Sequence, residues 1–325
     1  MIDGKRTSIT KATRKECLEE AVALKLGQKT AVAVSSGTLN EAIDHYIESR
    51  QNVLSPSTIR GYRMIQRNRF QSMMKRRLSD VRPDQWQRAV NTEARLCSAK
   101  TLTNAWRFIS SVISEETGER ISVRLPQVPA ADRPWLTPEQ IPIFLDAIHG
   151  HSIEIMCLLA LSSLRRSEIL ALTWNDIDMK AGQIHVRGAA VYNEDYQLVQ
   201  KRTNKNKTSA RIVPIIPPLR DALELAERKS EYVCTLSPRS AYEHINRCCR
   251  KAGLPEVGIH GLRHSFASLA YHLGMPEKVA MQIGGWSDSK TMHDIYTHIS
   301  QSEIQKYASE MMGFYNFGNG NWQQK

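Results

Sequence analysis

Apolar residues recur every three or four positions between residues 37 and 120, in segments separated by capping and turn residues. This spacing gathers apolar side chains on one face of each helix. Thr38 and Glu41 form a capping box at the start of the first helix, and further helices are expected from about residues 55, 83 and 100. We therefore expect a compact bundle of four helices. The side chains predicted to face its interior are Leu39, Ile43, Tyr46, Ile47, Tyr62, Ile65, Phe70, Trp86, Val90, Leu102, Trp106, Ile109 and Ile113.

A second helical region occupies residues 135–312, after a proline-containing linker at 121–134 that has no sustained periodicity. Helices are expected at about 138–148, 152–162 and 166–173, and again beyond Pro217, with stops at Gly253, Gly274 and Gly284-Gly285. Between these helices, β-type segments are expected at 176–186, 197–202 and 211–215. The last two are joined by the polar stretch 203–208. The predicted fold class is mainly α with a small antiparallel β-sheet.

The two ends of the chain lack the regular apolar spacing of these regions. Residues 1–36 are basic and loosely patterned, with one helix expected near 13–26, and residues 313–325 form a tail. The N-terminus has no apolar core of a secretory signal, and no run is long enough to span a bilayer. We expect a cytoplasmic protein with no membrane partner. The six cysteines form no CxxC pair, which fits reduced thiols rather than a metal site.

Charge narrows the choice of partner. The 44 Lys and Arg residues exceed the 33 Asp and Glu residues, a net charge of +11. Such an excess favours a polyanion, because basic side chains placed on phosphates release condensed counterions. Six basic residues on or just after the second helix of the bundle are the candidate contacts with DNA: Arg60, Arg63, Arg67, Lys75, Arg76 and Arg77. The alternative is an ordinary solvated helix face.

Three separated elements of the larger region carry candidate chemistry. The first is Leu164-Arg165-Arg166-Ser167-Glu168, the second is His260-Gly261-Leu262-Arg263-His264, and the third joins Gly285-Trp286 to Tyr296-Thr297-His298. Each alone is a weak signal, since a buried Arg–Glu pair is usually structural. Their order and spacing together resemble the tyrosine recombinase (phage integrase) family. The resemblance covers about residues 137–312, and the upstream bundle resembles the core-binding domain of that family.

The resemblance implies a role for each matching residue. Arg165 and Arg263 correspond to the two catalytic arginines, Glu168 to the acidic residue of the first motif, and Tyr296 to the nucleophile. The remaining matches are His260, Trp286 and Lys207, the last in a β-hairpin loop where Lys205 competes for the same role. His264, His298, Asp176 and Asp178 are interpreted as structural residues, and no metal site is expected.

These residue types suit attack on a phosphodiester. Two arginines can hold the charge that develops on the phosphate oxygens, with His260 and Trp286 as further donors. Lys207 would protonate the departing 5′ oxygen, and Tyr296 would form a 3′-phosphotyrosine that conserves the bond energy. The family therefore implies strand exchange without metal, ATP or another cofactor.

Two departures from the family pattern affect the site. Ser162-Ser163 stands where the family usually has Thr-Gly, so that a positive φ at Ser163 would be strained. The separation of Trp286 and Tyr296 is one residue longer than the commonest spacing. Neither departure removes a reactive group, and we expect an active enzyme.

The resemblance predicts a site-specific recombinase of the integrase or excisionase type, from a mobile genetic element. It implies double-stranded DNA as substrate, a homo-tetramer on paired DNA sites, and accessory DNA-bending or directionality proteins as further partners. The apolar positions Ile304, Tyr307, Ala308, Met311 and Met312 form a tail helix that docks either on a neighbouring protomer or on its own domain. Two alternative functions remain open: sequence-specific DNA binding with impaired catalysis, and DNA relaxation of the type IB topoisomerase kind.

Overall fold

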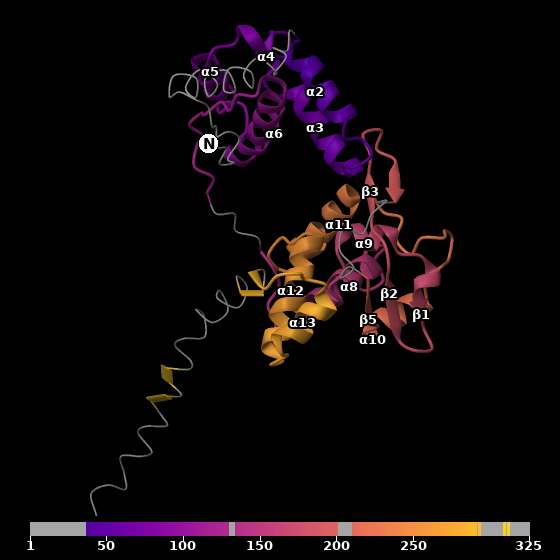
Figure 1. Ribbon diagram of the computed structural model, residues 1–325. Coiled ribbons are helices and arrows are strands. Elements are labelled where there is room, and N and C mark those ends of the chain that lie inside the picture. Colours follow the sequence, from indigo (N-terminus) through magenta and orange to yellow (C-terminus); the bar gives the residue numbers. More distant parts are fainter. Residues whose placement is uncertain are drawn as a thin grey trace, which may run out of the picture. The chain divides into compact units, whose positions relative to one another are not determined.

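The computed structural model describes residues 37–129, 134–200, 210–290, 292–293, 308–309 and 311–312. The chain divides into two compact units, Met1–Ala130 with Tyr192–Gln197, and Ala131–Val191 with Leu198–Lys325. Both units are mainly helical, and the strands of the second unit are short and antiparallel, which confirms the predicted fold class (Figure 1). None of the helices described has the length and apolarity needed to cross a membrane.

The first unit is a helical bundle that contains the four predicted helices in order, together with a short helix α4 that the sequence did not predict. Its helices are α2 (Leu39–Glu48), α3 (Pro56–Asn68), α4 (Gln71–Met74), α5 (Pro83–Glu93) and α6 (Ala99–Thr117), with a 3-10 turn η1 (Leu78–Asp80). The Thr38–Glu41 capping box is present, and α3 begins where expected, with Ser55 as its N-cap. Most of the predicted interior is buried, with Leu39, Leu102 and Ile109 fully enclosed. Tyr46, Tyr62 and Ile65 are only partly buried against this core.

The segment that follows α6 packs on the bundle. It has no regular secondary structure from residue 119 to 129, but Ile121, Val123 and Leu125 pack against the bundle core. The amide of Gln87 on α5 binds both backbone groups of Arg124: its oxygen accepts from the backbone N–H at 2.8 Å, and its nitrogen donates to the carbonyl at 3.1 Å. This paired contact satisfies backbone groups that an irregular segment would otherwise leave to water.

The second unit has its own hydrophobic core, and its helices α8 and α12 pack against each other. Its helices are α7 (Gln140–Ile148), α8 (Glu154–Leu161), α9 (Arg166–Ala171), α10 (Pro217–Glu224), α11 (Pro238–Lys251), α12 (Ile259–His272) and α13 (Glu277–Gly284). Helix α7 begins two residues later than predicted, because Pro138 and Glu139 form a turn before it. The positive φ values of Gly253, Gly274 and Gly285 confirm the predicted stops.

The strands differ from the prediction in how they pair. Strand β2 (Gln183–Val186) lies between β1 (Ile177–Asp178) and β5 (Arg211–Pro214), antiparallel to both. Strand β4 (Leu198–Gln200) instead pairs with β3 (Ala190–Tyr192), a strand that the sequence did not indicate. The two strand candidates that flank 203–208 therefore belong to separate sheets in the described part of the chain. Asp176 and Asp178 accept hydrogen bonds from Thr173 and Ala181, which supports the structural interpretation of both carboxylates.

Candidate active site

Arg165 and Glu168 lie together at the start of α9. Arg165 precedes the first turn of the helix, and Glu168 in that turn accepts from the Arg165 backbone N–H at 2.8 Å and from its Nη1 at 2.7 Å. The Glu168 side chain is 5% exposed, whereas that of Arg165 is 33% exposed. The carboxylate thus holds the backbone and the guanidinium of Arg165 at once, and the arginine keeps access to solvent.

Arg263 reaches the same place from α12. It is 3% exposed, and its two terminal nitrogens donate to the carbonyls of Ser163 and Gly284, the second at 2.6 Å. Burial, together with the nearby charge of Arg165, lowers the pKa of Arg263 to about 9. The guanidinium therefore keeps its charge at neutral pH, and its remaining N–H groups can donate to an anion.

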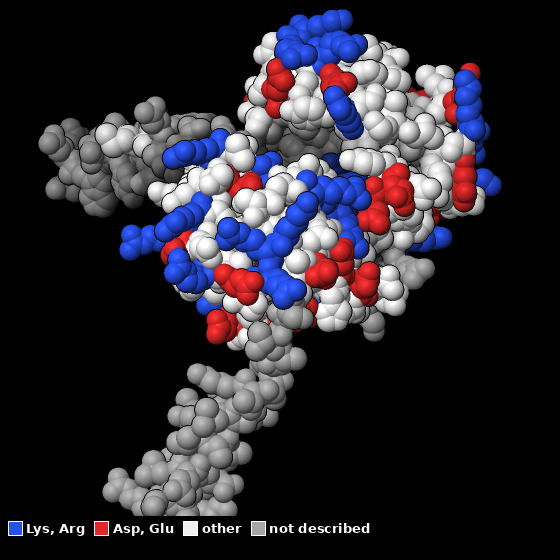
Figure 2. Space-filling view, turned by 90° about the horizontal axis from the view of Figure 1, so that it is seen from above, with Lys and Arg blue, Asp and Glu red and all other residues white. Residues whose placement is uncertain are grey.

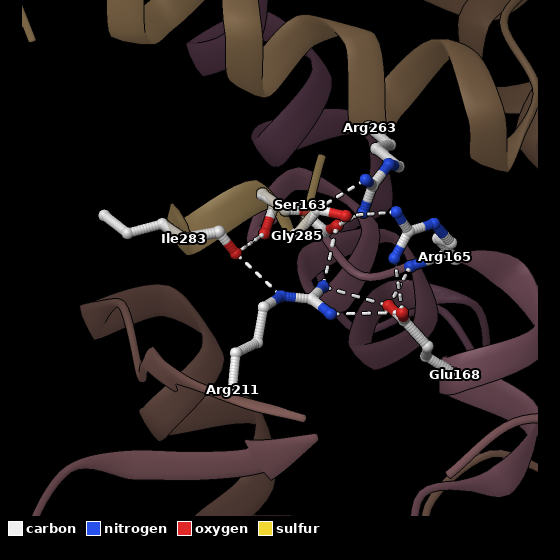
Figure 3. Close-up of polar contacts among 8 residues, drawn as sticks. Ser163, Arg165, Glu168, Arg211, Arg263, Ile283 and Gly285 are labelled. Atoms are coloured by element: carbon white, nitrogen blue, oxygen red, sulfur yellow. Dashed lines mark hydrogen bonds and ion pairs between the residues drawn. The ribbon is translucent and has the colours of Figure 1, made fainter. Parts of the chain in front are cut away.

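The carboxyl end of α13 is the shared acceptor for this cluster (Figure 3). Gly285 accepts from Arg165 Nη2, Gly284 from Arg263, and Ile283 from the Nε of Arg211 at 2.8 Å. Helix C-termini leave carbonyls without partners inside the helix and carry partial negative charge, so cations are stabilised there. One helix end consequently orients three arginines that come from α9, α12 and β5.

Ser163 provides the second acceptor and is strained, as its position opposite the usual glycine predicted. Its φ is 79°, it is fully buried, and its hydroxyl donates to the Ile283 carbonyl at 3.0 Å. Its own carbonyl accepts a hydrogen bond from Arg263 and another, at 3.4 Å, from Arg211. The backbone at this turn is therefore held in a left-handed conformation by contacts from three elements.

This conformation leads to a prediction about the residue at position 163. We expect Ser163→Gly to be more stable than Ser163→Ala by about 1–2 kcal/mol, since a Cβ in the left-handed region costs about that much. Both variants lose the hydroxyl bond, so the difference between them isolates the backbone effect. Urea unfolding of the two proteins would measure it. Ser162, with a φ of −81°, is the control position, where alanine should be the more stable residue. Equal stability at 163 would contradict the strain.

His260 and Trp286 flank the arginine cluster. His260 lies on the first turn of α12, is exposed, and meets His264 edge to face with ring centroids 5.8 Å apart. Arg263 stacks over the Trp286 ring at 4.7 Å from Cζ to the centroid. An added Cβ at Gly284 would come within 2.2 Å of that ring, so this glycine makes room for the indole.

Several candidate residues are not among those that the structure describes. They are Tyr296, Lys207, Lys205 and His298, together with the helix expected near 13–26 and two residues of the tail stripe, Ile304 and Tyr307. Their predicted roles stay predictions. Ala308, Met311 and Met312, the described members of the stripe, are exposed.

The basic residues of the bundle are placed unevenly. Arg63 is engaged within the unit, pairing with Asp44 of α2 and donating to Gln66 at 2.9 Å. Arg60 is partly buried, whereas four of the six candidates are exposed: Arg67, Lys75, Arg76 and Arg77. Lysine and arginine side chains recur across the face seen in Figure 2, interspersed with acidic residues. Exposure leaves these four side chains able to reach phosphates, while the ion pair of Arg63 fixes its direction.

Arg211 is the site residue that sequence analysis missed. Its side chain is 5% exposed and binds both oxygens of Glu168, at 2.9 Å from Nη2 and 3.1 Å from Nη1. The available signal was the alternation of strand β5, in which Val213 is buried and Ile212 is 52% exposed. Arg211 shares the face of Val213, so a charged residue points inward where an apolar one is expected.

The arginine cluster, with the carboxylate of Glu168 bound by Arg165 and Arg211, is chemically suited to a phosphate-like anion. The sequence model of the phage integrase family matches residues 134–303, and the chain belongs to this family. It is 26% identical over 193 residues to a tyrosine recombinase XerC-like protein of Caldanaerobacter subterraneus, which covers 50% of this chain and 49% of the relative. The chain thus spans about half the length of the curated relatives it first matches.

Solved structures show the same fold. The Tn1549 transposon integrase in complex with transposon right end DNA is 19% identical, with a TM-score of 0.64 over 84% of this chain and all of that one. A lambda integrase tetramer bound to a Holliday junction is 16% identical, with a TM-score of 0.58 over 90% of this chain and 89% of that one.

Proposed function

We propose that this chain is a site-specific DNA recombinase that cleaves and rejoins DNA through a phosphotyrosyl intermediate. The observation that carries the proposal is the convergence of Arg165 and Arg263, from α9 and α12, on carbonyls at the end of α13. Each guanidinium uses some of its N–H groups in hydrogen bonds to the protein, and its other N–H groups can donate to an anion. Two guanidiniums so fixed can stabilise the charge that develops on a phosphate during attack.

The proposed chemistry assigns one role to each residue. The Tyr296 oxygen bonds to phosphorus as the bond to the 5′ oxygen breaks, and Lys207 or Lys205 gives that oxygen a proton. His260 and Trp286 add donors beside the arginines. Attack by the 5′ hydroxyl of a partner strand then reverses the reaction and releases the tyrosine. The covalent intermediate conserves the energy of the phosphodiester, so ATP is not needed.

The proposed substrate is double-stranded DNA, bound by the bundle and by the larger unit in the cytoplasm. The net charge of +11 and the exposed basic residues after α3 support a polyanionic partner. We further propose a homo-tetramer on paired sites and integration or excision of a mobile element, aided by accessory proteins. The tetramer is supported by analogy with the lambda integrase assembly on a Holliday junction.

Trapping of a covalent adduct tests this function. The purified protein is mixed with a nicked duplex that carries the junction sequence flanking its own gene, because loss of the short cleaved strand blocks religation. We expect an SDS-resistant adduct on the 3′ side of the break and, after proteolysis, a nucleotide on a tyrosine peptide. Tight binding without an adduct would favour a DNA-binding protein with impaired catalysis. An adduct with relaxation but no strand exchange would favour the topoisomerase-like function.

A further inference from the structure

The carboxylate of Glu168 is bound by two arginines, Arg165 on one side and Arg211 on the other. Its oxygen Oε1 accepts from the Nη1 atoms of Arg165 and Arg211, and Oε2 accepts from the Arg165 backbone and from Arg211 Nη2. An ionised carboxylate has about four acceptor sites, so these four bonds use its whole capacity. Figure 3 shows the Arg211 fork facing the carboxylate from the strand side.

Charge balance decides what Arg211 does for Arg165. The described cluster contains three guanidiniums and one carboxylate, and Glu168 is 5% exposed. Without Arg211, the direct ion-pair partner of this buried carboxylate would be Arg165. The carboxylate would then neutralise the charge of Arg165. With Arg211 present, a cation that is itself 5% exposed neutralises the carboxylate. The positive charge of Arg165, at 33% exposure, remains available to an anion.

The remaining contacts of Arg211 fix its position. Its Nε donates to the Ile283 carbonyl, and an added Cβ at Gly285 would come within 2.9 Å of its Nη1. The guanidinium therefore lies against the same turn of α13 whose carbonyls receive Arg165 and Arg263. Strand β5 holds its backbone through the Val186–Arg211 pairing with β2. Arg211 thus joins β5, α9 and α13 beneath the two arginines of the proposed reaction.

We propose that Arg211 is a positioning residue for strand cleavage: it neutralises and holds Glu168, so that Arg165 is directed toward the scissile phosphate with its charge intact. The inference rests on the proposed function, and it adds a third arginine to that site. Arg211 acts through its contacts with Glu168, which in turn holds Arg165. Lysine cannot replace it fully, because the ammonium lacks the planar fork that reaches both carboxylate oxygens and the Ile283 carbonyl.

Single-turnover cleavage of two substrates distinguishes positioning from general loss of structure. One carries an ordinary scissile phosphodiester, and the other a neutral methylphosphonate. We expect Arg211→Met to slow cleavage of the phosphodiester on the order of 100-fold, because Arg165 would no longer be held as a donor to the developing oxyanion. The loss on methylphosphonate should be several-fold at most, since less charge then needs stabilisation. Arg211→Lys should fall between parent and Arg211→Met, and Arg165→Ala should show the same substrate pattern.

A structural role alone would slow both substrates equally, and that result would overturn the inference. Arg250→Ala is the matched control, because this exposed arginine on α11 pairs with Glu256 and lies outside the cluster. It should match the parent on both substrates. The melting temperature of each variant shows whether it is folded under the assay conditions.

A DNA-free measurement separates failure of this inference from failure of the proposed function. Orthovanadate mimics a five-coordinate phosphate, and we expect it to raise the melting temperature of the parent and of Arg250→Ala but not of Arg211→Met. An equal rise in Arg211→Met would overturn the role of Arg211, even if the parent cleaves DNA. A rise confined to proteins with Arg211, without any covalent adduct, would support the role of Arg211 in anion binding and overturn only the recombinase chemistry. A parent with neither an adduct nor a rise would overturn both.

Discussion

Replacing Tyr296 with phenylalanine should abolish the covalent protein–DNA adduct while leaving DNA binding unchanged. Phenylalanine keeps the aromatic ring and lacks the hydroxyl oxygen that would bond to phosphorus, so the reaction has no nucleophile. The affinity should stay within about twofold, because phosphate contacts from basic side chains dominate binding to DNA. Adduct formation on a nicked duplex and gel-shift titration at one salt concentration measure the two quantities side by side.

Tyr307→Phe is the matched control for this experiment, since it removes a tyrosine hydroxyl from the same tail region. We expect it to form the adduct at the parental rate. If Tyr296→Phe still formed an adduct and Tyr307→Phe did not, the nucleophile would have been assigned to the wrong tyrosine. The extra residue between Trp286 and Tyr296 makes this comparison informative, because the spacing to the expected nucleophile departs from the commonest one in the family.

Replacing Arg263 with alanine should reduce the rate of strand cleavage by roughly 10²–10³-fold, the cost of losing a fixed donor to a developing oxyanion. Arg263 is 3% exposed and is aimed by the carbonyls of Ser163 and Gly284, so water cannot take over its role without reorganisation. Arg263→Lys should retain part of the rate, since it keeps a charge but not the fork. Single-turnover cleavage measures both effects.

The same substitution should also destabilise the larger unit. The Gly284 carbonyl loses the bond from Arg263, which costs roughly 1–3 kcal/mol for a buried group left without a partner, while the Ser163 carbonyl keeps its 3.4 Å bond from Arg211. Urea unfolding therefore accompanies the kinetics, and the assay is run where the variant is folded. A cleavage rate within tenfold of the parent in folded Arg263→Ala would contradict a role for this arginine in the reaction.

Local patterns determined much of the fold. The Thr38–Glu41 capping box, the Ser55-Pro56 helix start and the apolar spacing of α6 each act over one or two turns, so the sequence was sufficient to place these helices. Gly253 and Gly274 end helices for an equally local reason, a positive φ that glycine adopts at no steric cost. The pairing of strands was not local: β5 joins β2 from 25 residues or more along the chain, and no nearby pattern specifies that partner.

In the candidate site, too, some residues were indicated by the sequence and others only by the tertiary structure. Arg165, Glu168, His260, Arg263 and Trp286 were indicated by sequence, because the family resemblance lies in short motifs with defined spacing. The sequence also indicated that Ser163 would be strained if its φ were positive, and its φ is 79°. Arg211 belongs to no motif, and only its burial against Glu168 reveals it. The tertiary structure also decided that the carbonyls of Ile283, Gly284 and Gly285 orient three arginines. These acceptors are backbone atoms, which every residue carries, and their role depends only on where the chain places them.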